Sequence, residues 1–307
     1  MTRGDGSGYW LSGWRVRSAV PLPELPAWTV DDRAPDIEIE LGTVPAATAD
    51  WKTFSPLIHL ASPDRVRLAI ARVASYWVEG GRRVIVEPHL PVEAPAIRLF
   101  LLGTVLAILC YQRGLVPLHA SAVEVPGGAL LMSGRSGLGK STLAAMLVAR
   151  GHRLIADDVC VLDLGAGDDP LIRPVLPRLK LWQDAAQAMA VSTDGLEQVR
   201  DQALKFSLPV AEGRFRSEPI RAAHIVLLRP SRLSPAISAT PLAPIAAIES
   251  GQLFYRRRLA EALGGRALLF RARIALGRFV PITELSRPDD LGALPALADR
   301  VLALVGR

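Results

Sequence analysis

The sequence predicts a mixed α/β protein in which a glycine-rich loop joins a buried strand to a helix. Residues 129–133 form an apolar run typical of a buried strand, and residues 142–150 carry apolar side chains at helical spacing. Gly151 is a natural end for that helix. Residues 152–156 predict a second strand, which the crossover rule makes parallel to the first. A strand–helix–strand unit of this kind is the building block of an α/β domain.

Short strands upstream of the loop predict a small β-rich domain over residues 1–95. Adjacent glycines, Gly80 and Gly81, predict a hairpin turn before the last of these strands. We therefore divide the chain into a β-rich N-terminal domain, residues 1–95, and an α/β domain, residues 96–307. The predicted strands of the first domain, recognised by alternating polar and apolar residues or by short apolar runs, are 14–20, 37–41, 66–70 and 83–86.

The composition excludes several classes of protein. Half of the 307 residues are apolar, which is too many for a disordered chain. The net charge of +6 comes from scattered arginines, so it suits an anionic substrate and gives no sign of nucleic-acid binding. The longest apolar run, 99–111, is too short to cross a bilayer and predicts a core helix over 94–112. Without a signal peptide at the N-terminus, we expect a cytoplasmic protein with reduced cysteines.

The loop itself, GRSGLGKS, fits in full the pattern of a phosphate-binding loop. Its glycines permit a tight turn whose N–H groups point at phosphates, and the helix N-terminus adds partial positive charge. Lys140 supplies a full charge for the β- and γ-phosphates, and the Ser141 hydroxyl is placed to ligate Mg2+. We therefore expect ATP and Mg2+ as cofactors. The expected nucleotide-binding residues of the loop are Gly134, Ser136, Gly137, Leu138, Gly139, Lys140, Ser141 and Thr142.

The second strand of the unit ends in two adjacent carboxylates, Asp157 and Asp158. Because parallel strands end at the same edge of a sheet, both acids are expected beside the loop. One carboxylate is enough to hold Mg2+, and a second offers a base for a substrate hydroxyl. The alternative is that one acid serves the metal while its neighbour is solvated or forms a salt bridge.

These residues resemble the HPr kinase/phosphorylase family. In that family a loop of the form GxSGxGKS precedes a GH-R-L-V-A-D-D strand, matched here by GRSGLGKS and GHRLIADD, and a histidine ahead of the loop is matched by His119. The resemblance is close over residues 116–161 and implies a kinase fold shared with ATP-type phosphoenolpyruvate carboxykinases. It implies that Asp157 is the general base, that Asp158 joins Ser141 at the metal, and that His119 lies near the transferring phosphate. Residues 115–123 predict one apolar strand that contains His119, so the residues alone allow this side chain to be a hydrogen-bonded core histidine.

Two lysines after the acid pair are further candidates for the nucleotide site. Lys180 lies in the alternating stretch RLKLW, and Lys205 follows it at a distance. The chain has only four lysines among its 36 basic residues, which favours a role for each that arginine cannot fill. A cation on a strand near the loop can hold the nucleotide or the leaving phosphate. The alternative for both lysines is an exposed charge at a strand edge.

The leading hypothesis is an ATP- and Mg-dependent kinase that transfers the γ-phosphate to a serine or other hydroxyl of a peptide or small protein. The E-I-R-G-L-G signature of the resembled family is missing after Asp158, so we expect neither the reverse phosphorylase reaction nor HPr as the acceptor. The segment SAVPLPELP resembles, more loosely, HPr-kinase-related proteins linked to lasso peptides. The alternatives are a nucleotide-binding regulatory module without phosphotransfer and a small-molecule kinase. We expect no nucleic-acid or membrane partner and leave a homo-oligomer open.

The C-terminal third predicts a strand and two helices. Residues 220–228 read as a strand, and residues 242–257 as a helix whose end, or following turn, holds the basic run Arg256–Arg258. The second helix is the last of the chain, and its apolar stripe runs from Leu291 to Val305. Asp289 or Asp290 is expected to cap it.

Overall fold

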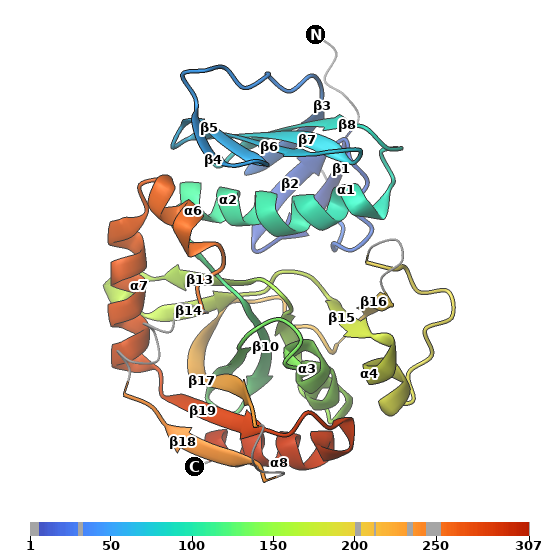
Figure 1. Cartoon of the computed structure of the whole chain (residues 1–307), viewed down its shortest axis with the longest axis vertical. Coiled ribbons are helices and arrows are strands. Elements are labelled where there is room, and N and C mark those ends of the chain that lie inside the picture. Colours follow the sequence, from blue (N-terminus) through green and yellow to red (C-terminus); the bar gives the residue numbers. More distant parts are fainter. Residues whose placement is uncertain are drawn as a thin grey trace. The chain divides into compact units, whose positions relative to one another are not determined.

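The computed structural model describes residues 6–29, 33–199, 204–211, 213–231, 236–243 and 253–306. The chain forms two compact units, which we call unit 1 and unit 2. Unit 1 contains Met1–Val116 and Arg256–Leu269, and unit 2 contains Pro117–Tyr255 and Phe270–Arg307. Each unit has its own β-sheet and helices, so the predicted mixed α/β class is confirmed (Figure 1). The domain boundary near residue 95 stays a prediction, because compactness does not test which part folds alone.

Unit 1 is built on an eight-stranded sheet with the order β1-β2-β3-β8-β7-β6-β5-β4. The predicted turn at Gly80 and Gly81 is confirmed: it joins β7 to β8 in an antiparallel pair, and both glycines have positive φ, 58° and 65°. The strands are β1 (Ser7–Leu11), β2 (Trp14–Ser18), β3 (Ile37–Leu41), β4 (Lys52–Ser55), β5 (Ile58–Ser62), β6 (Arg65–Ile70), β7 (Ala74–Glu79) and β8 (Arg83–Pro88).

A long apolar helix covers one face of this sheet. It consists of α1 (Pro95–Phe100), a π-helical turn (Leu101–Val105) and α2 (Leu106–Gln112). The buried Tyr76 hydroxyl donates to the carbonyl of Ile97 at 2.9 Å, which fixes the helix to β7. Residues 95–112 are long and apolar enough to cross a membrane by those criteria alone, yet 67% of the segment is buried within the protein. The predicted core helix over 94–112 is therefore confirmed.

Unit 2 is built on a nine-stranded sheet whose main order is β12-β10-β11-β17-β14-β13-β9, with β19 beside β17 and β18 beside β19. β10 is antiparallel to both β11 and β12, so β11 and β12 run parallel with β10 between them. The predicted parallel crossover is confirmed, with a third strand inserted into it. The strands are β9 (Val116–Leu118), β10 (Ala120–Val125), β11 (Gly128–Ser133), β12 (Leu154–Ala156), β13 (Cys160–Leu164), β14 (Pro170–Arg173), β17 (Ile220–Pro230), β18 (Ser238–Pro241) and β19 (Ile282–Arg287).

The core of unit 2 lies between the sheet and two helices. Helix α3 (Lys140–Ala149) follows the glycine-rich loop and packs on β10 and on α8 (Leu294–Val305). Leu143 and Leu147 of α3 meet Leu297 and Val301 of α8 in one cluster of buried side chains. A separate two-stranded sheet, β15 (Arg178–Trp182) with β16 (Lys205–Pro209), stands beside α3 and leads into α4 (Gln183–Ala188). The remaining helices are α6 (Arg257–Ala262) and α7 (Arg266–Phe279).

Two sequence expectations need correction. The apolar stretch expected as one strand over 115–123 is two strands, β9 and β10, separated at His119, whose backbone N–H bonds to the carbonyl of Leu253 at 2.7 Å. Of the two positions expected for the basic run Arg256–Arg258, the helix end is wrong: Arg256 lies in a turn with a left-handed φ of 51°, and Arg257 and Arg258 begin α6. Most of the helix expected over 242–257 lies outside the described residues.

Candidate functional site

The glycine-rich loop leaves β11 and closes on the first turn of α3. Gly137 and Gly139 have φ of 87° and 78°, a left-handed conformation that side-chain-bearing residues adopt at a cost. The Lys140 ammonium folds back over the loop and donates to the carbonyls of Gly134 and Arg135, at 3.0 Å and 3.2 Å. Only 7% of Lys140 is exposed, so its charge is held at the centre of the loop.

Asp157, at the end of β12, is buried and hydrogen-bonded on both carboxylate oxygens. Its Oδ1 accepts from the hydroxyls of Ser141 at 2.8 Å and Ser121 at 2.6 Å. Its Oδ2 accepts from the backbone N–H of Lys180 at 2.8 Å. The crossover thus brings this carboxylate to the hydroxyl at the start of α3, as the sequence predicted. Ser121, which comes from the inserted strand β10, was not expected at the site.

Asp158 is oriented differently and faces open space. Its φ of 70° is left-handed, an uncommon conformation that Asp tolerates better than most residues. Its Oδ2 pairs with the Lys180 ammonium at 2.9 Å, and its Oδ1 lies 3.6 Å from Nδ1 of His119. The His119 ring is also 3.1 Å from the Asp158 carbonyl. The two consecutive acids therefore have separate environments.

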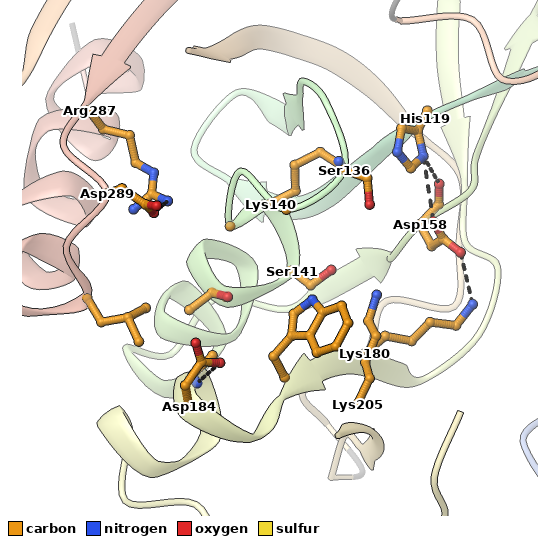
Figure 2. Close-up of a pocket in the computed structure, with 16 residues that line it drawn as sticks. His119, Ser136, Lys140, Ser141, Asp158, Lys180, Asp184, Lys205, Arg287 and Asp289 are labelled. Atoms are coloured by element: carbon orange, nitrogen blue, oxygen red, sulfur yellow. Dashed lines mark hydrogen bonds and ion pairs between the residues drawn. The ribbon is translucent and has the colours of Figure 1, made fainter. Parts of the chain in front are cut away.

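A pocket joins these groups, and Figure 2 shows His119, Asp158 and Lys180 on one side of Lys140 and Ser141. Three of the four lysines of the chain line it: Lys140, Lys180 and Lys205. The Lys205 ammonium lies 5.6 Å from the ring centre of Trp182, a cation–π contact across β15 and β16. The full lining is His119, Ser136, Gly137, Gly139, Lys140, Ser141, Thr142, Asp158, Lys180, Trp182, Asp184, Ala185, Lys205, Arg287, Asp289 and Leu291.

Burial and neighbouring charges set the protonation states in this pocket. Burial raises the pKa of Asp158, but Lys180, together with His119 and Lys205, outweighs burial and lowers that pKa to about 2. Burial lowers the pKa of Lys180, but Asp158, together with Asp157 and Tyr255, outweighs burial and raises that pKa. Burial and the Lys140 charge lower the pKa of His119 despite the nearby acids. At neutral pH the pocket therefore holds an ionised Asp158, a charged Lys180 and a neutral His119.

Most of the residues expected at the site come together. Of the expected set, Gly134, Leu138 and Asp157 do not line the pocket, although the Gly134 carbonyl and the Asp157 carboxylate bond to residues that do. Sequence reasoning missed Ser121, Trp182, Asp184, Arg287 and Asp289. Trp182 follows Lys180 on β15 and could have been found from the RLKLW alternation, whereas no spacing rule connects Arg287 to the loop.

The Asp158–Lys180 pair gives a testable pH dependence. An acid whose pKa falls on folding stabilises the fold above its unfolded pKa of 3.8, and that contribution disappears as the pH falls to about 2. Because the Asp158 side chain is 33% exposed, water screens the pair. We expect Lys180→Met to lower the melting temperature at neutral pH by roughly 2–4 °C, the shift for about 1 kcal/mol in a domain of this size.

Thermal melts of both proteins in metal-free buffer at successive pH values measure this effect. The difference should shrink as the pH falls from 3.8 to about 2. Lys52→Met, on the exposed edge strand β4, is the matched control. A constant difference across this range would show that the pair does not stabilise the fold through the Asp158 charge.

Comparisons with known proteins find similar sequences for the central segment of the chain. Residues 115–168 match the family described as the HPr serine kinase C-terminal domain. An HPr kinase/phosphorylase of Chlorobium phaeobacteroides is 59% identical over 44 residues, which is 14% of each chain. One from Treponema pallidum is 45% identical over 60 residues, 20% of this chain and 19% of that protein.

A solved structure, the HPr(Ser) kinase/phosphatase of Coxiella burnetii, covers 61% of this chain and 88% of its own at 14% identity, with a TM-score of 0.32. A likeness at that score carries no argument about the fold. The central segment of the chain is HPr kinase-like. The chain matches less than a fifth of the length of these curated relatives, 14% and 19%, so their activity, substrates and assembly are not thereby its own.

Proposed function

We propose that the protein is an ATP- and Mg2+-dependent kinase that phosphorylates a serine or other hydroxyl of a peptide or small protein. The proposal rests mainly on one observation: Lys140 of the glycine-rich loop, Ser141 and Asp158 line the same pocket, and the Ser141 hydroxyl donates a hydrogen bond to Asp157. Loop, lysine, hydroxyl and two acids are the parts that phosphoryl transfer requires. The HPr kinase-like central segment supports the same class of reaction.

The residues present fit a magnesium ion. Mg2+ prefers oxygen ligands and is commonly held by one or two carboxylates together with substrate phosphates. The Ser141 hydroxyl and the Asp157 carboxylate lie 2.8 Å apart at the start of α3, and both are oxygen donors. When bound, the ion would neutralise charge on the phosphates. The absence of a cluster of three or more His, Cys, Asp or Glu side chains among the described residues suits a metal completed by the nucleotide.

The hydrogen bonds favour an exchange of the roles that the resemblance implied for the two acids. Asp157 is 4% exposed, does not line the pocket and bonds to Ser141, which suits the metal side. Asp158 lines the pocket beside His119 and Lys180, where an acceptor hydroxyl can approach. Its low pKa keeps Asp158 ionised and therefore able to accept a proton. A strong base is not needed, because the transition state of phosphoryl transfer is loose. In the proposal Lys140 and the loop N–H groups hold the β- and γ-phosphates, and Lys180 and Lys205 balance charge at the reacting end.

Mass spectrometry tests the proposal. The protein is incubated with Mg-ATP and candidate acceptors, namely peptides encoded beside its gene and HPr, the acceptor named by its relatives. We expect one phosphate on a serine of a peptide acceptor and none on HPr. ATP binding without transfer to any acceptor or to water would favour a regulatory module, and transfer to HPr would correct the choice of acceptor. A cytoplasmic location and self-association belong to the proposal and await fractionation and sedimentation.

A further inference from the structure

A buried arginine from the far end of the chain lies at the glycine-rich loop. β19 runs parallel to β17, and β17 runs parallel to β11, so the carboxyl ends of all three strands lie at one sheet edge. β11 leads into the glycine-rich loop at that edge, and β19 ends there with Arg287. A Cβ atom placed on Gly139 would lie 3.6 Å from an Arg287 guanidinium nitrogen. The guanidinium therefore lies beside the loop at Gly139.

This arginine has more hydrogen-bonding capacity than the protein uses. Only 8% of Arg287 is exposed, and it lines the pocket. Its guanidinium has five N–H donors, yet among the described residues its side chain donates one hydrogen bond, to Asp289 at 3.2 Å. The Asp289 side chain is 94% exposed, so it compensates the buried charge weakly. A buried and under-used guanidinium that faces a pocket favours an anionic ligand, above all a phosphate.

The pocket has two chemically different ends. Figure 2 shows Arg287 and Asp289 on the opposite side of Lys140 from His119 and Asp158. The end with Asp158 and Lys180 is the reacting end in the proposed function. A triphosphate whose terminal phosphate lies there and whose chain follows the loop must leave its nucleoside at the other end. That end offers the Arg287 guanidinium and the exposed Asp289 carboxylate.

We propose that Arg287 and Asp289 form a ribonucleoside subsite. The Arg287 guanidinium binds the phosphate next to the ribose, and the Asp289 carboxylate accepts hydrogen bonds from the ribose hydroxyls. The inference rests on the proposed nucleotide site and adds a selection for ribose. A carboxylate that accepts from a sugar hydroxyl rejects an analogue without that hydroxyl, because its bonding partner is then missing.

Calorimetric titration with three probes in Mg2+ buffer tests the two residues separately. The probes are ATP, 2′,3′-dideoxy-ATP and inorganic tripolyphosphate. The wild-type protein should prefer ATP to the dideoxy analogue by about fivefold or more, as expected for one or two hydrogen bonds. Asp289→Ala should remove that preference and leave tripolyphosphate binding unchanged. Arg287→Met should weaken all three probes by about tenfold or more, and Arg287→Lys by less.

Controls separate this inference from the proposed function. Asp299→Ala removes one exposed acid on α8, away from the pocket lining, and should match the wild-type protein. Lys140→Met should weaken tripolyphosphate binding whether or not Arg287 contributes to that binding. If Lys140→Met weakens tripolyphosphate while Arg287→Met and Asp289→Ala match the wild type, the subsite is wrong and the nucleotide site stands. If the wild-type protein binds none of the probes, both the ribonucleoside subsite and the proposed nucleotide site are wrong. Because Asp289 is exposed, its result stands even if Arg287→Met fails to fold.

Discussion

Asp158→Asn is expected to reduce phosphoryl transfer by at least about 100-fold while nucleotide affinity changes little, since a positioned base contributes about 100- to 10,000-fold. Asparagine keeps the size of the side chain and removes its charge. In the protein this carboxylate faces the pocket, between the Lys180 ammonium and the His119 ring. It does not contact Lys140 or Ser141 by any hydrogen bond among the described residues, so the groups proposed to hold the phosphates should remain in place. Initial rates with the acceptor found by mass spectrometry, and titration with Mg-ADP, measure the two quantities.

Asp157→Asn is the matched variant at the adjacent position. It changes a carboxylate that accepts three hydrogen bonds, one of them from Ser141. We expect its nucleotide affinity to lose most of its dependence on Mg2+ concentration. Asp299→Asn, on the surface of α8, controls for removal of an acid. The exchange of roles would be refuted if Asp157→Asn abolished transfer with Mg2+ dependence intact and Asp158→Asn stayed active.

The sequence predicted the centre of the site because its chemistry is local. The loop, α3 and the acid pair all lie within residues 134–158, and the crossover rule alone brings Asp157 to Ser141. The sequence did not predict which acid faces the pocket. The orientation of the two acids depends on the left-handed backbone at Asp158 and on the Ser121 hydroxyl, which bonds to Asp157. Ser121 belongs to β10, a strand that lies between β11 and β12, the two strands joined by the crossover. Hydrophobic periodicity carries neither piece of information.

The sequence did not predict Arg287 and Asp289 on the other side of the pocket, for a different reason. Arg287 approaches Gly139 only because β19 pairs with β17 and β17 with β11, a register set by packing across most of unit 2. The lysines behave differently. In a chain that uses arginine almost everywhere, three of four lysines gather in one pocket, so their rarity was a usable signal. Composition located these cations although their spacing did not.

Lys140→Met is expected to weaken ATP and tripolyphosphate binding by about 10- to 100-fold, the loss that corresponds to one hydrogen bond between charged groups. The ammonium is buried at the loop centre and, among the described residues, donates hydrogen bonds only to two carbonyls, so a phosphate oxygen can take up its remaining donor capacity. Burial lowers the pKa of Lys140, while Asp158 and Asp157 oppose that change. A bound triphosphate adds negative charge and would hold the proton more firmly.

Two controls and one contrary outcome make the Lys140→Met experiment decisive. Methionine retains the length and apolar stem of lysine, so packing around the loop should survive, and an unchanged melting temperature would verify this. Lys52→Met, on edge strand β4 of unit 1, removes the same charge without touching the pocket and should bind ATP as the wild type does. If Lys140→Met bound ATP with wild-type affinity, the loop would not be a phosphate site. The proposed kinase would then lose its physical basis, since Lys180 and Lys205 contact a carboxylate and an indole rather than the loop.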